Sequence, residues 1–439
     1  MTQLRGRSVA VLGGGWAGMA AAVELADAGA RVTVLEAAPM LGGRARTIEH
    51  RGLRLDNGAH ILIGAYRHTL ALMRKVGVDE VHGPLQRIPL DLHFPGAFRL
   101  RAPRLPRPLH LVAALLGASG LPWTERLAAV RFMREAQAIR FELPVDISVD
   151  RLLAQHAQGP RTRRYLWEPL CIAALNTPVH EASAQVFLNV LRDSLNGAAR
   201  DSALLLPRQD LSRLFPLPAA EYVRARAGRV IAGCAVHAVS ARAAGFEIEH
   251  SRGRETCDAV VCALPPFRVA QTLAPLAPLA TTLRDIEALQ YEPIYSVYLQ
   301  YDSDIRLPQP MTGLDGCLAH WAFDRGALAG QPGLLCALIS ARGAHEALSH
   351  QQLATQVAQD LAARFRHLRA PHWSKVVAER RATFSCRPGL ARPNQRTAVP
   401  GLVLAGDYTA SPYPATLEAA VRSGMRCAQL LNEGSHVHA

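Results

Sequence analysis

Residues 9–46 read VAVLGGGWAGMAAAVELADAGARVTVLEAAPMLGGRAR and decide the fold. The stretch begins with an apolar run over 9–12 and enters a glycine-rich turn over 13–18. An alanine-rich amphipathic segment follows, and a β-branched run over 31–35 ends on Glu36. This order predicts strand, turn, helix and strand, which is the first unit of a parallel α/β sheet that binds a dinucleotide.

The small residues of the turn each have a role in this prediction. Gly13 allows the tight turn, Gly15 lets the backbone approach a pyrophosphate, and Gly18 lets the helix pack closely on the strand. The helix then begins near Trp16 and Ala17 with free N–H groups and the positive end of its dipole, which favours phosphate binding.

Glu36 and the segment after it indicate which dinucleotide binds. The Glu36 carboxylate, with Ala37 beside it in the predicted site, can accept hydrogen bonds from a ribose and would repel a 2′-phosphate. A second glycine pair then leads into an arginine. Backbone at Gly43 and the guanidinium of Arg44 suit a flavin dinucleotide diphosphate. The sequence therefore predicts FAD as the cofactor.

The length and composition predict two domains. A chain of 439 residues, 49% of them hydrophobic, is long for one compact core. We predict an α/β fold with a discontinuous Rossmann-like FAD-binding domain and an inserted α+β substrate domain. The FAD-binding domain comprises residues 1–83, 212–266 and 390–435, and the substrate domain comprises 84–211 and 267–389.

Local patterns predict the main elements of the interior. Residues 128–214 are mostly helical in pattern, and 228–239 reads as strand, turn and strand. The alternation over 291–301 and the apolar run over 333–341 predict strands, and 351–366 predicts a surface helix.

Charge and cysteine usage narrow the class of protein. The net charge of +13 is spread along the chain without a nucleic-acid-binding motif, so we expect no nucleic acid partner. The eight cysteines show no paired spacing, and no metal-ligand pattern stands out, so we expect reduced thiols and no metal. No leader precedes the glycine turn, and no apolar run reaches the roughly 18 residues of a membrane span, which predicts a cytoplasmic protein.

The stretch 84–122 differs from its surroundings. Arginines alternate there with prolines: Arg99, Arg101, Arg104 and Arg107. The apolar segment LHLVAALLGASGLPW over 109–123 follows. Basic residues beside a short apolar helix that ends at Trp123 are typical of a peripheral contact with a membrane surface. An ordinary loop and a core helix explain the pattern equally well.

A second cofactor signal lies near the C-terminus. Asp407, after Gly406, ends the apolar strand GLVLAGDY, where ligands of open α/β sheets gather. The helix that begins near Thr416, after Ala415, would point its positive end at the flavin ring and favour the negative charge of reduced flavin. Glu418 in its first turn indicates capping rather than catalysis.

An Asx-Gly turn after the Gly-Gly-Arg segment would bring more backbone against the flavin. The predicted cofactor set is completed by Asn57, Gly58, Ala59 and Val236. His60 is a candidate acid near the ring, although a lone histidine is more often structural. Tyr408 and Tyr413 are candidate proton donors, although core packing also explains them.

The two ends, GGGWAG…E…LGGRAR and AGDYTASPYPATLEAAVRSG, resemble the superfamily of FAD-dependent amine oxidases and carotenoid desaturases. Three interior segments resemble its squalene-associated branch, the hydroxysqualene dehydroxylases. They are RLDNGAHILIGAYRHTLALMRKVG (54–77), WEPLCIAALNTP (167–178) and LLLPRQDLSRLFPLPAAEYV (204–223). Ala59 departs from the glutamine expected before His60.

The resemblance implies an amine oxidase-like fold and reductive removal of the hydroxyl group of hydroxysqualene, giving squalene for hopanoid synthesis. Hydride from N5 of reduced flavin would reach an allylic cation after a general acid releases water. The sequence shows no nicotinamide-binding motif beyond the single dinucleotide motif, so we expect an external electron donor or free NAD(P)H to supply the electrons. A nearly insoluble isoprenoid substrate would be taken from a bilayer, so we expect peripheral contact with the inner face of the cell membrane.

Other functions stay open. An oxidative, phytoene-type desaturase of the same superfamily differs in redox direction. A non-catalytic flavoprotein that carries isoprenoids would bind FAD and lipid without turnover. An amine oxidase is less favoured, because no obvious aromatic pair accompanies the C-terminal flavin motif.

Overall fold

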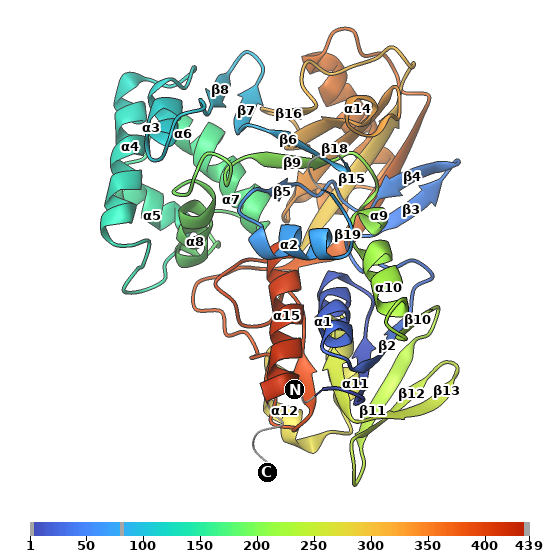
Figure 1. Cartoon of the computed structure of the whole chain (residues 1–439). Helices are drawn as coiled ribbons and strands as arrows, with labels where there is room; N and C mark the ends of the chain where they lie inside the picture. The colour runs from blue at the N-terminus through green and yellow to red at the C-terminus, as the bar shows by residue number, and fades with distance from the viewer. Residues whose placement is uncertain (1–3, 80–82, 434–439) are drawn as a thin grey trace.

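A computed structural model describes residues 4–79 and 83–433 (Figure 1). Five parallel strands form one sheet in the order β10-β2-β1-β14-β20. They are β1 (Ser8–Leu12), β2 (Arg31–Glu36), β10 (Arg229–Ala232), β14 (Ala259–Cys262) and β20 (Leu402–Leu404). The central strands are apolar runs buried on both faces, as parallel sheets require. The predicted order of strand, turn, helix and strand is confirmed.

Helices from the two ends of the chain pack together on this sheet. The first, α1 (Trp16–Asp27), lies beside α15 (Leu417–Glu433) (Figure 1). A Cβ added to Gly424 would lie 2.1 Å from the Ala17 carbonyl oxygen, so only glycine permits this close approach. Further elements of this half are α9 (Leu211–Leu214), α10 (Pro216–Arg224), α11 (Pro266–Leu273), the 3₁₀ turn Ala277–Leu279 and α12 (Ala280–Glu287).

Strands from three separated parts of the sequence therefore build the parallel sheet. An antiparallel ribbon extends this half of the molecule through β11 (Val236–Ala241), β12 (Phe246–His250) and β13 (Gly253–Cys257). The domain boundaries stay a prediction, and residues 1–3, 80–82 and 434–435 of the predicted FAD-binding segments lie outside the described residues.

A second sheet forms the upper part of the molecule in Figure 1, in the order β16-β17-β18-β15-β19. Its strands are β15 (Tyr291–Gln300), β16 (Met311–Gly313), β17 (Trp321–Asp324), β18 (Leu334–Ser340) and β19 (Trp373–Phe384). The helix α14 (His350–Arg364) buries its apolar side chains against the sheet. The predicted strands at 291–301 and 333–341 and the predicted helix at 351–366 are confirmed. Short helices α13 (Arg325–Ala329) and Ala344–Ala347 connect these strands.

A helical layer lies to one side of this sheet (Figure 1). It contains α3 (Leu109–Leu116), α4 (Trp123–Ala138), α5 (Val149–Gln155), α6 (Pro160–Thr162), a π-helical turn Arg163–Trp167, α7 (Glu168–Leu175) and α8 (Ala184–Ser194). The predicted helical character of 128–214 is wrong at β9 (Leu204–Pro207). This strand pairs with β5 (Leu62–Ile63) and β6 (Leu85–Ile88), whose distance in sequence hides the pairing from a local pattern.

The arginine- and proline-rich stretch also differs from its prediction. Residues 91–101 form a hairpin of β7 (Asp91–Phe94) and β8 (Phe98–Arg101). The apolar helix α3 ends at Leu116, and Trp123 begins the next helix after Pro122, so the expected helix ending at Trp123 is wrong. Proline preorganises a helix start and cannot continue one. No helix within 4–79 and 83–433 is long and apolar enough to cross a membrane.

Candidate flavin site

The site begins at the carboxyl edge of the parallel sheet. The register pairs Leu12 with Leu35 and with Cys262, and Cys262 with Leu404, so the segments that follow these four residues leave the sheet at one edge. This edge is where ligands of open α/β folds bind. The glycine turn, Glu36 and Asp407 are thereby brought together.

Close packing requires glycine at two positions of the turn. Gly13 has a φ of +108°, and a Cβ there would lie 2.6 Å from the Ala263 carbonyl oxygen. A Cβ on Gly18 would lie 2.0 Å from the Gly13 carbonyl oxygen. Side chains at either position would push α1 away from the sheet and move the N-terminus of α1 out of the site.

The start of α1 fits a diphosphate. Its N-cap, Gly15, provides no side-chain hydrogen bond, and no acid occupies the first turn, so the N–H groups of Trp16 and Ala17 remain for a ligand. The intrahelical hydrogen bonds begin with the Met19 N–H, which donates to the Gly15 carbonyl oxygen at 2.9 Å. Gly15 faces Gly43, since a Cβ on Gly43 would lie 3.2 Å from the Gly15 Cα. Two backbones without side chains thus form a narrow cradle that suits the pyrophosphate of FAD.

Glu36 lies where the ribose is predicted. Its carboxylate oxygens accept hydrogen bonds from the N–H of Gly14 at 2.6 Å and of Ala38 at 2.8 Å. Ala37, which lies between Glu36 and Ala38 in the sequence, is exposed. The Cys234 N–H donates to the Glu36 carbonyl oxygen at 2.8 Å, and β11 begins two residues later at Val236. Val236 therefore lies near the same end of the predicted site.

An ion pair joins the two ends of the sequence at the centre of the site. The Arg44 guanidinium lies 2.5 Å from a carboxylate oxygen of Asp407 and donates to the Ala382 carbonyl oxygen at 2.6 Å. Burial opposes the positive charge of Arg44, but Asp407 raises its pKa above the usual value. The Asn57 amide donates to the Arg44 carbonyl oxygen at 3.0 Å and to Glu379 at 3.2 Å. Glu379 was not predicted from the sequence.

Arg392, which the sequence patterns also did not predict as a site residue, shapes the loop that carries Asp407. Its guanidinium donates to the carbonyl oxygens of Asp407 (2.5 Å), Ser411 (2.9 Å) and Tyr413 (2.7 Å), and stacks on Phe384 with 4.6 Å to the ring centroid. Burial lowers the pKa of Arg392. No local motif marks this arginine, because its partners are backbone carbonyl groups defined only by the folded loop.

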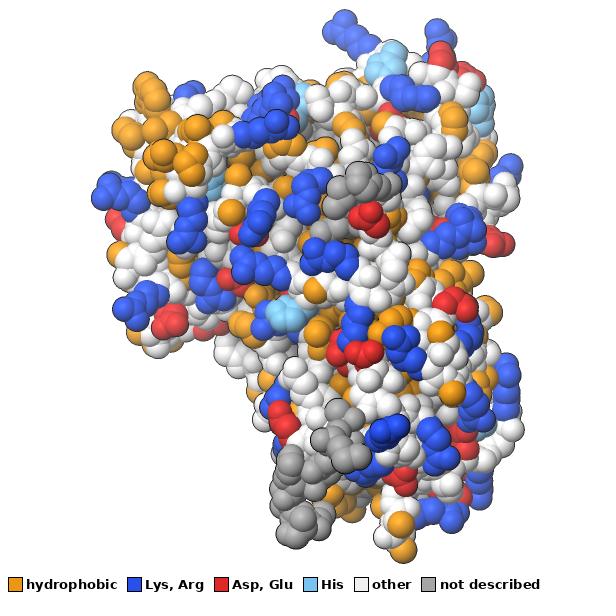
Figure 2. All heavy atoms as spheres, viewed as in Figure 1, with side chains coloured by type: hydrophobic (Ala, Val, Ile, Leu, Met, Phe, Trp, Pro, Cys, Tyr) orange, Lys and Arg blue, Asp and Glu red, His pale blue; other side chains and the backbone are white. Residues whose placement is uncertain are grey.

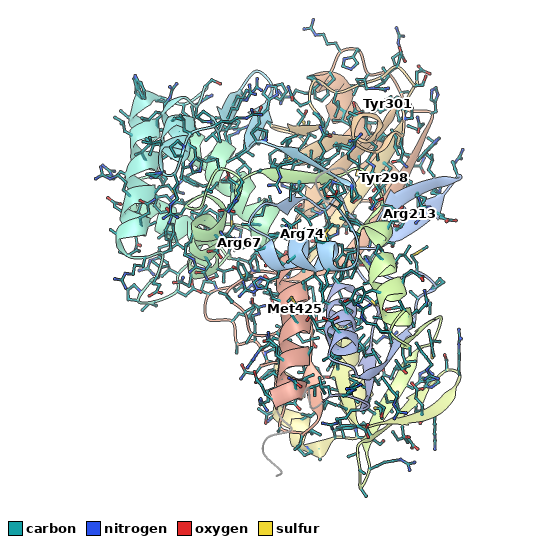
Figure 3. All side chains as sticks on the ribbon, in the orientation of Figure 1. Arg67, Arg74, Arg213, Tyr298, Tyr301 and Met425 are labelled. Atoms are coloured by element: carbon teal, nitrogen blue, oxygen red, sulfur yellow. The ribbon has the colours of Figure 1, made fainter. Side chains whose placement is uncertain are left out.

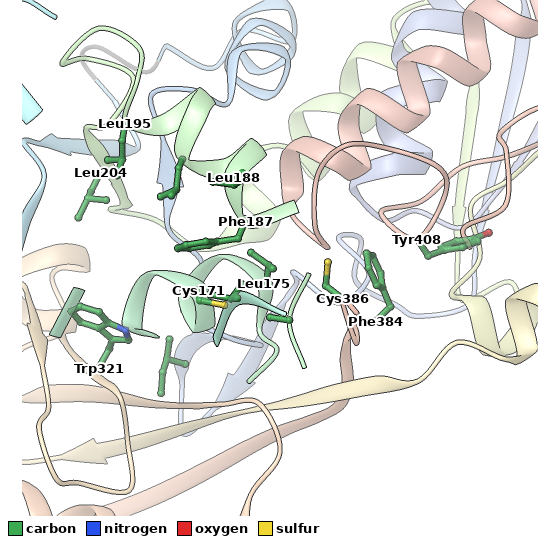
Figure 4. Close-up of a cluster of buried hydrophobic side chains, with 14 of the residues drawn as sticks. Cys171, Leu175, Phe187, Leu188, Leu195, Leu204, Trp321, Phe384, Cys386 and Tyr408 are labelled. Atoms are coloured by element: carbon green, nitrogen blue, oxygen red, sulfur yellow. The ribbon is translucent and has the colours of Figure 1, made fainter. Parts of the chain in front are cut away.

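Tyr408 and Tyr413 occupy different surroundings. Tyr408 is fully buried, and its hydroxyl has no hydrogen-bond partner among the residues that the structure describes. A Cβ on Gly406 would lie 2.4 Å from its ring. Figure 4 shows Tyr408 beyond Phe384 and Cys386, pointing away from them. The Tyr413 hydroxyl donates to Asp193 at 2.5 Å, and burial raises its pKa to about 12.

The start of α15 provides capping side chains for two different helices. Thr416, which follows Ala415, caps α15 itself, because its hydroxyl accepts a hydrogen bond from the Ala419 N–H at 3.2 Å. Glu418 instead caps α2 (Arg67–Lys75), accepting from the N–H groups of His68 at 3.2 Å and Thr69 at 2.9 Å. The interpretation of Glu418 as a cap rather than a catalyst agrees with these contacts, although the helix it caps is not its own.

A small cavity lies beside the Asx-Gly turn and is lined by three titratable side chains. Its polar lining is Asp56, His60 and Arg325, and its apolar lining includes Ala59 and Phe323. Burial lowers the pKa of His60 to about 4. Burial raises the pKa of Asp56 to about 6, although Arg325 at 3.6 Å and the Leu211 N–H oppose the shift.

Asp56 is held in place from the second sheet. Tyr298, on β15, is labelled in Figure 3. Its hydroxyl donates to the Asp56 carbonyl oxygen at 2.8 Å and accepts a hydrogen bond from the Asp56 N–H at 3.1 Å. Asp56 ends β4 (Leu53–Asp56), which pairs with β3 (Thr47–His50). The sequence singled out neither the role of Asp56 nor Arg325. The only available signal was an acid directly before the Asx-Gly turn.

Fold and site define a flavin-dependent oxidoreductase. The family model for flavin containing amine oxidoreductases matches residues 16–432, and the chain belongs to that family. It is 31% identical to a hydroxysqualene dehydroxylase of Rhodopseudomonas palustris, over 97% of this chain and 98% of the other. It is 27% identical to a hydroxysqualene dehydroxylase of Zymomonas mobilis, over 96% of this chain and 98% of the other. It is 24% identical to a probable zeta-carotene desaturase of Synechococcus elongatus, over 98% of this chain and all of the other.

Solved structures share the fold. An oxidoreductase of Methanosarcina mazei has a TM-score of 0.75 at 15% identity, covering 96% of this chain and all of the other. A cyclohexylamine oxidase of Brevibacterium oxydans has a TM-score of 0.67 at 18% identity, covering 98% and 100%. The predicted amine oxidase-like fold, the superfamily, FAD as cofactor and the assignment as an enzyme are confirmed. The individual cofactor and catalytic residues stay predictions.

Proposed function

We propose that the protein removes the hydroxyl group of hydroxysqualene reductively and forms squalene. The observation that carries this proposal is the similarity to three hydroxysqualene dehydroxylases at 27–31% identity over at least 96% of the chain. In this reaction the substrate hydroxyl takes up a proton and leaves as water, and the resulting allylic cation takes up a hydride. One proton and one hydride thus replace a C–O bond with a C–H bond.

The chain's residues would hold FAD as follows. The first turn of α1 and the Gly15–Gly43 cradle would receive the diphosphate, and Glu36 would bind the adenine ribose. Arg44 and Asp407, which join the two ends of the chain, would contact the part of FAD that lies between the segments after β2 and β20. Bound FAD in its reduced form supplies the hydride. The predicted set that this proposal retains is Gly13, Gly15, Trp16, Ala17, Gly18, Glu36, Ala37, Gly43, Arg44, Asn57, Gly58, Ala59, Val236, Gly406, Asp407, Ala415 and Thr416.

Asp56 is the proton donor in this proposal. With a pKa of about 6, roughly a tenth of the Asp56 carboxyl groups are protonated at pH 7 and about half at pH 6, so the protonated acid is available close to neutral pH. His60 lines the same cavity but is neutral there, so it would position the substrate rather than donate a proton. Tyr413 already donates to Asp193, and Tyr408 is buried away from the cavity lining.

Apolar packing around the site would protect a cation from water. Phe323, Leu206 and Leu328 line the cavity beside Asp56. Figure 4 shows buried side chains from the helical layer, among them Phe187 and Leu175, approaching Cys386 and Phe384. Excluding water from the reacting carbon prevents recapture of the hydroxyl group.

A desaturase that acts on a carotenoid precursor is the second candidate. It is supported by similarity to a zeta-carotene desaturase at 24% and a 15-cis-phytoene desaturase at 25% identity, both from Synechococcus elongatus. The two functions differ in direction, because a desaturase removes hydride from its substrate and needs no acid to release water. We favour the reductive reaction because the dehydroxylases are the more similar group.

The partners follow from the proposed reaction. An electron donor from outside the chain must re-reduce the enzyme after each turnover. The substrate is a hydrophobic isoprenoid taken from the inner face of the cell membrane. Eight cysteines without a disulfide are compatible with a reducing compartment.

The test is a single turnover without oxygen. Photoreduced holoenzyme is mixed with detergent-dispersed hydroxysqualene, and the organic extract is analysed by mass spectrometry. We expect one squalene per flavin and return of the oxidised flavin spectrum. Oxidised holoenzyme serves as the control and should form none. Bleaching of oxidised enzyme by phytoene or zeta-carotene, without squalene from the reduced enzyme, would assign the desaturase reaction instead.

A further inference from the structure

Large apolar side chains gather on the outer surface of the helical layer. We call the group Leu105, Leu109, Trp123 and Leu127 the α3–α4 patch; their exposed fractions are 41%, 54%, 62% and 58%. They come from the loop before α3, the start of α3 and the first turns of α4. Figure 2 shows a concentration of hydrophobic surface at the upper left, over the position of α3 and α4 in Figure 1. Contiguous exposed apolar surface of this kind marks an interaction site.

The patch is held in a defined geometry. The Arg126 guanidinium lies 4.9 Å from the centroid of the Trp123 ring. The same guanidinium donates to the carbonyl oxygens of Leu116 at 2.8 Å and Leu121 at 3.0 Å, which fixes the connection between α3 and α4. Trp123 is therefore presented outward from a rigid helix start rather than from a loose loop.

Exposed arginines lie close to the patch residues Leu105 and Leu109 in the sequence. Arg101, Arg104 and Arg107 are exposed and form no ion pair with any of the described residues. Arg99 differs, because its guanidinium is paired with Asp91 at 2.7 Å. Glu125, the acid in the first turn of α4, accepts hydrogen bonds from the N–H and hydroxyl of Thr162 and is only partly exposed.

We propose that the α3–α4 patch docks on a lipid bilayer that carries anionic headgroups. Tryptophan favours the membrane interface, leucines beside it enter the acyl boundary, and nearby arginines bind lipid phosphate. A second copy of the chain is the poorer occupant, because a two-fold contact would oppose the exposed arginines of the two copies. The docking needs no particular substrate, so it can hold or fail independently of the proposed reaction.

The test uses holoenzyme and vesicles of two compositions, phosphatidylcholine alone and phosphatidylcholine with phosphatidylglycerol. We expect sedimentation with the anionic vesicles, weaker binding to the neutral ones, and weakening with added salt. Binding should also shift tryptophan emission to shorter wavelength. Trp123→Phe should remove most of that shift and retain binding, because Trp16, Trp167 and Trp321 are buried and the partly buried Trp373 packs against His50 at the end of β3.

Two pairs of variants test the surface itself. Trp123→Ser with Leu127→Ser, and separately Arg104→Glu with Arg107→Glu, should each reduce partitioning into anionic vesicles about tenfold or more. Ile139→Ser with Val145→Ser is the apolar control, since both residues are exposed but follow the far end of α4, a helix about 24 Å long. Arg268→Glu on α11 is the charge control.

The outcomes separate docking from its alternatives. Retained binding in the patch variants, equal loss in the controls, or no binding of folded holoenzyme to either vesicle overturns the proposal. A concentration-dependent dimer that Trp123→Ser abolishes also overturns it, because a second copy then covers the patch. Unchanged flavin content and melting temperature exclude misfolding of the variants as the cause of lost binding.

Discussion

Asp56 and His60 line one cavity, yet burial moves their pKa values in opposite directions. Burial raises the pKa of the carboxyl group to about 6 and lowers that of the imidazole to about 4, because each neutral form is favoured away from water. Between pH 4 and 6 both groups are mainly neutral. Above pH 6 Asp56 loses its proton while the charge of His60 does not change. Of these two cavity groups, Asp56 is therefore the one that gives the reaction a pH dependence near neutrality.

We expect the single-turnover rate of reduced enzyme with hydroxysqualene to fall about tenfold per pH unit well above pH 6, as the protonated fraction of Asp56 falls. Asp56→Asn should lower the rate by about 10² to 10⁴ and remove that dependence. His60→Gln is the matched control from the same cavity and should keep it. The return of oxidised flavin absorbance in stopped flow measures the rate. An Asp56→Asn enzyme with the wild-type profile would exclude Asp56 as the acid.

At the scale of elements, α15 secures α2 through one buried carboxylate. Burial acts to raise the pKa of Glu418, but hydrogen bonds from His68 and Thr69 lower it below its usual value. A carboxyl group with a lowered folded-state pKa stabilises the fold above its unfolded pKa, and this contribution is lost as the pH falls through the folded pKa. Acid therefore weakens the junction of α2 with α15.

Glu418→Gln should lower the free energy of unfolding by about 1–3 kcal/mol at pH 7, because the ionised acceptor of several buried hydrogen bonds is replaced by a neutral amide. The loss should shrink as the pH falls below about 4.5, the usual pKa of glutamate. Urea unfolding at several pH values measures both effects. Glu221→Gln, at a side chain that is 73% exposed, is the control and should change little. An equal loss at every pH would show that the charge of Glu418 is not what stabilises the junction.

Elements with a strong local signature could be predicted from the sequence. The glycine turn with its flanking strands, β15, β18 and α14 all depend on periodicity or turn chemistry within a few residues. β9 could not be predicted as a strand, since LLLP is apolar throughout and its partners lie at 62–63 and 85–88. The prediction of one apolar helix that ends at Trp123 is wrong, because Pro122 precedes the first residue of α4 and α3 already ends at Leu116.

The same difference in range holds for the candidate site. Gly13, Gly18 and Glu36 act within one βαβ unit, so their sequence spacing is informative. The contacts of Arg392, Glu379 and Arg325 instead join segments that only folding brings together, and Asp56 acquires its raised pKa only by burial. None of these properties has a local sequence signature.

At the scale of the whole molecule, the site is a junction between the two ends of the chain. Arg44 follows β2, whereas Asp407 follows β20, and their ion pair lies at the shared edge of the parallel sheet. The helices that begin beside these segments, α1 and α15, pack against each other. A ligand that contacts both segments therefore stabilises the complete parallel layer and not one loop. This coupling predicts that FAD affinity and global stability change together.

Arg44→Gln and Asp407→Asn should each raise the Kd for FAD about tenfold to a hundredfold, which corresponds to about 1.4–2.7 kcal/mol. The double variant should lose less binding free energy for FAD than the sum of the two single losses, because the two side chains contact each other.

Wild-type protein at an FAD concentration of about 100 times its Kd should gain about 2.7 kcal/mol of stability over the apoprotein, and the variants should gain less at the same concentration. Flavin fluorescence titration and thermal unfolding measure the two quantities. Arg229→Gln, at the exposed end of β10, is the control. Strictly additive losses would show that the two side chains act on FAD separately, and an unchanged Kd in both single variants would exclude the ion pair from the site.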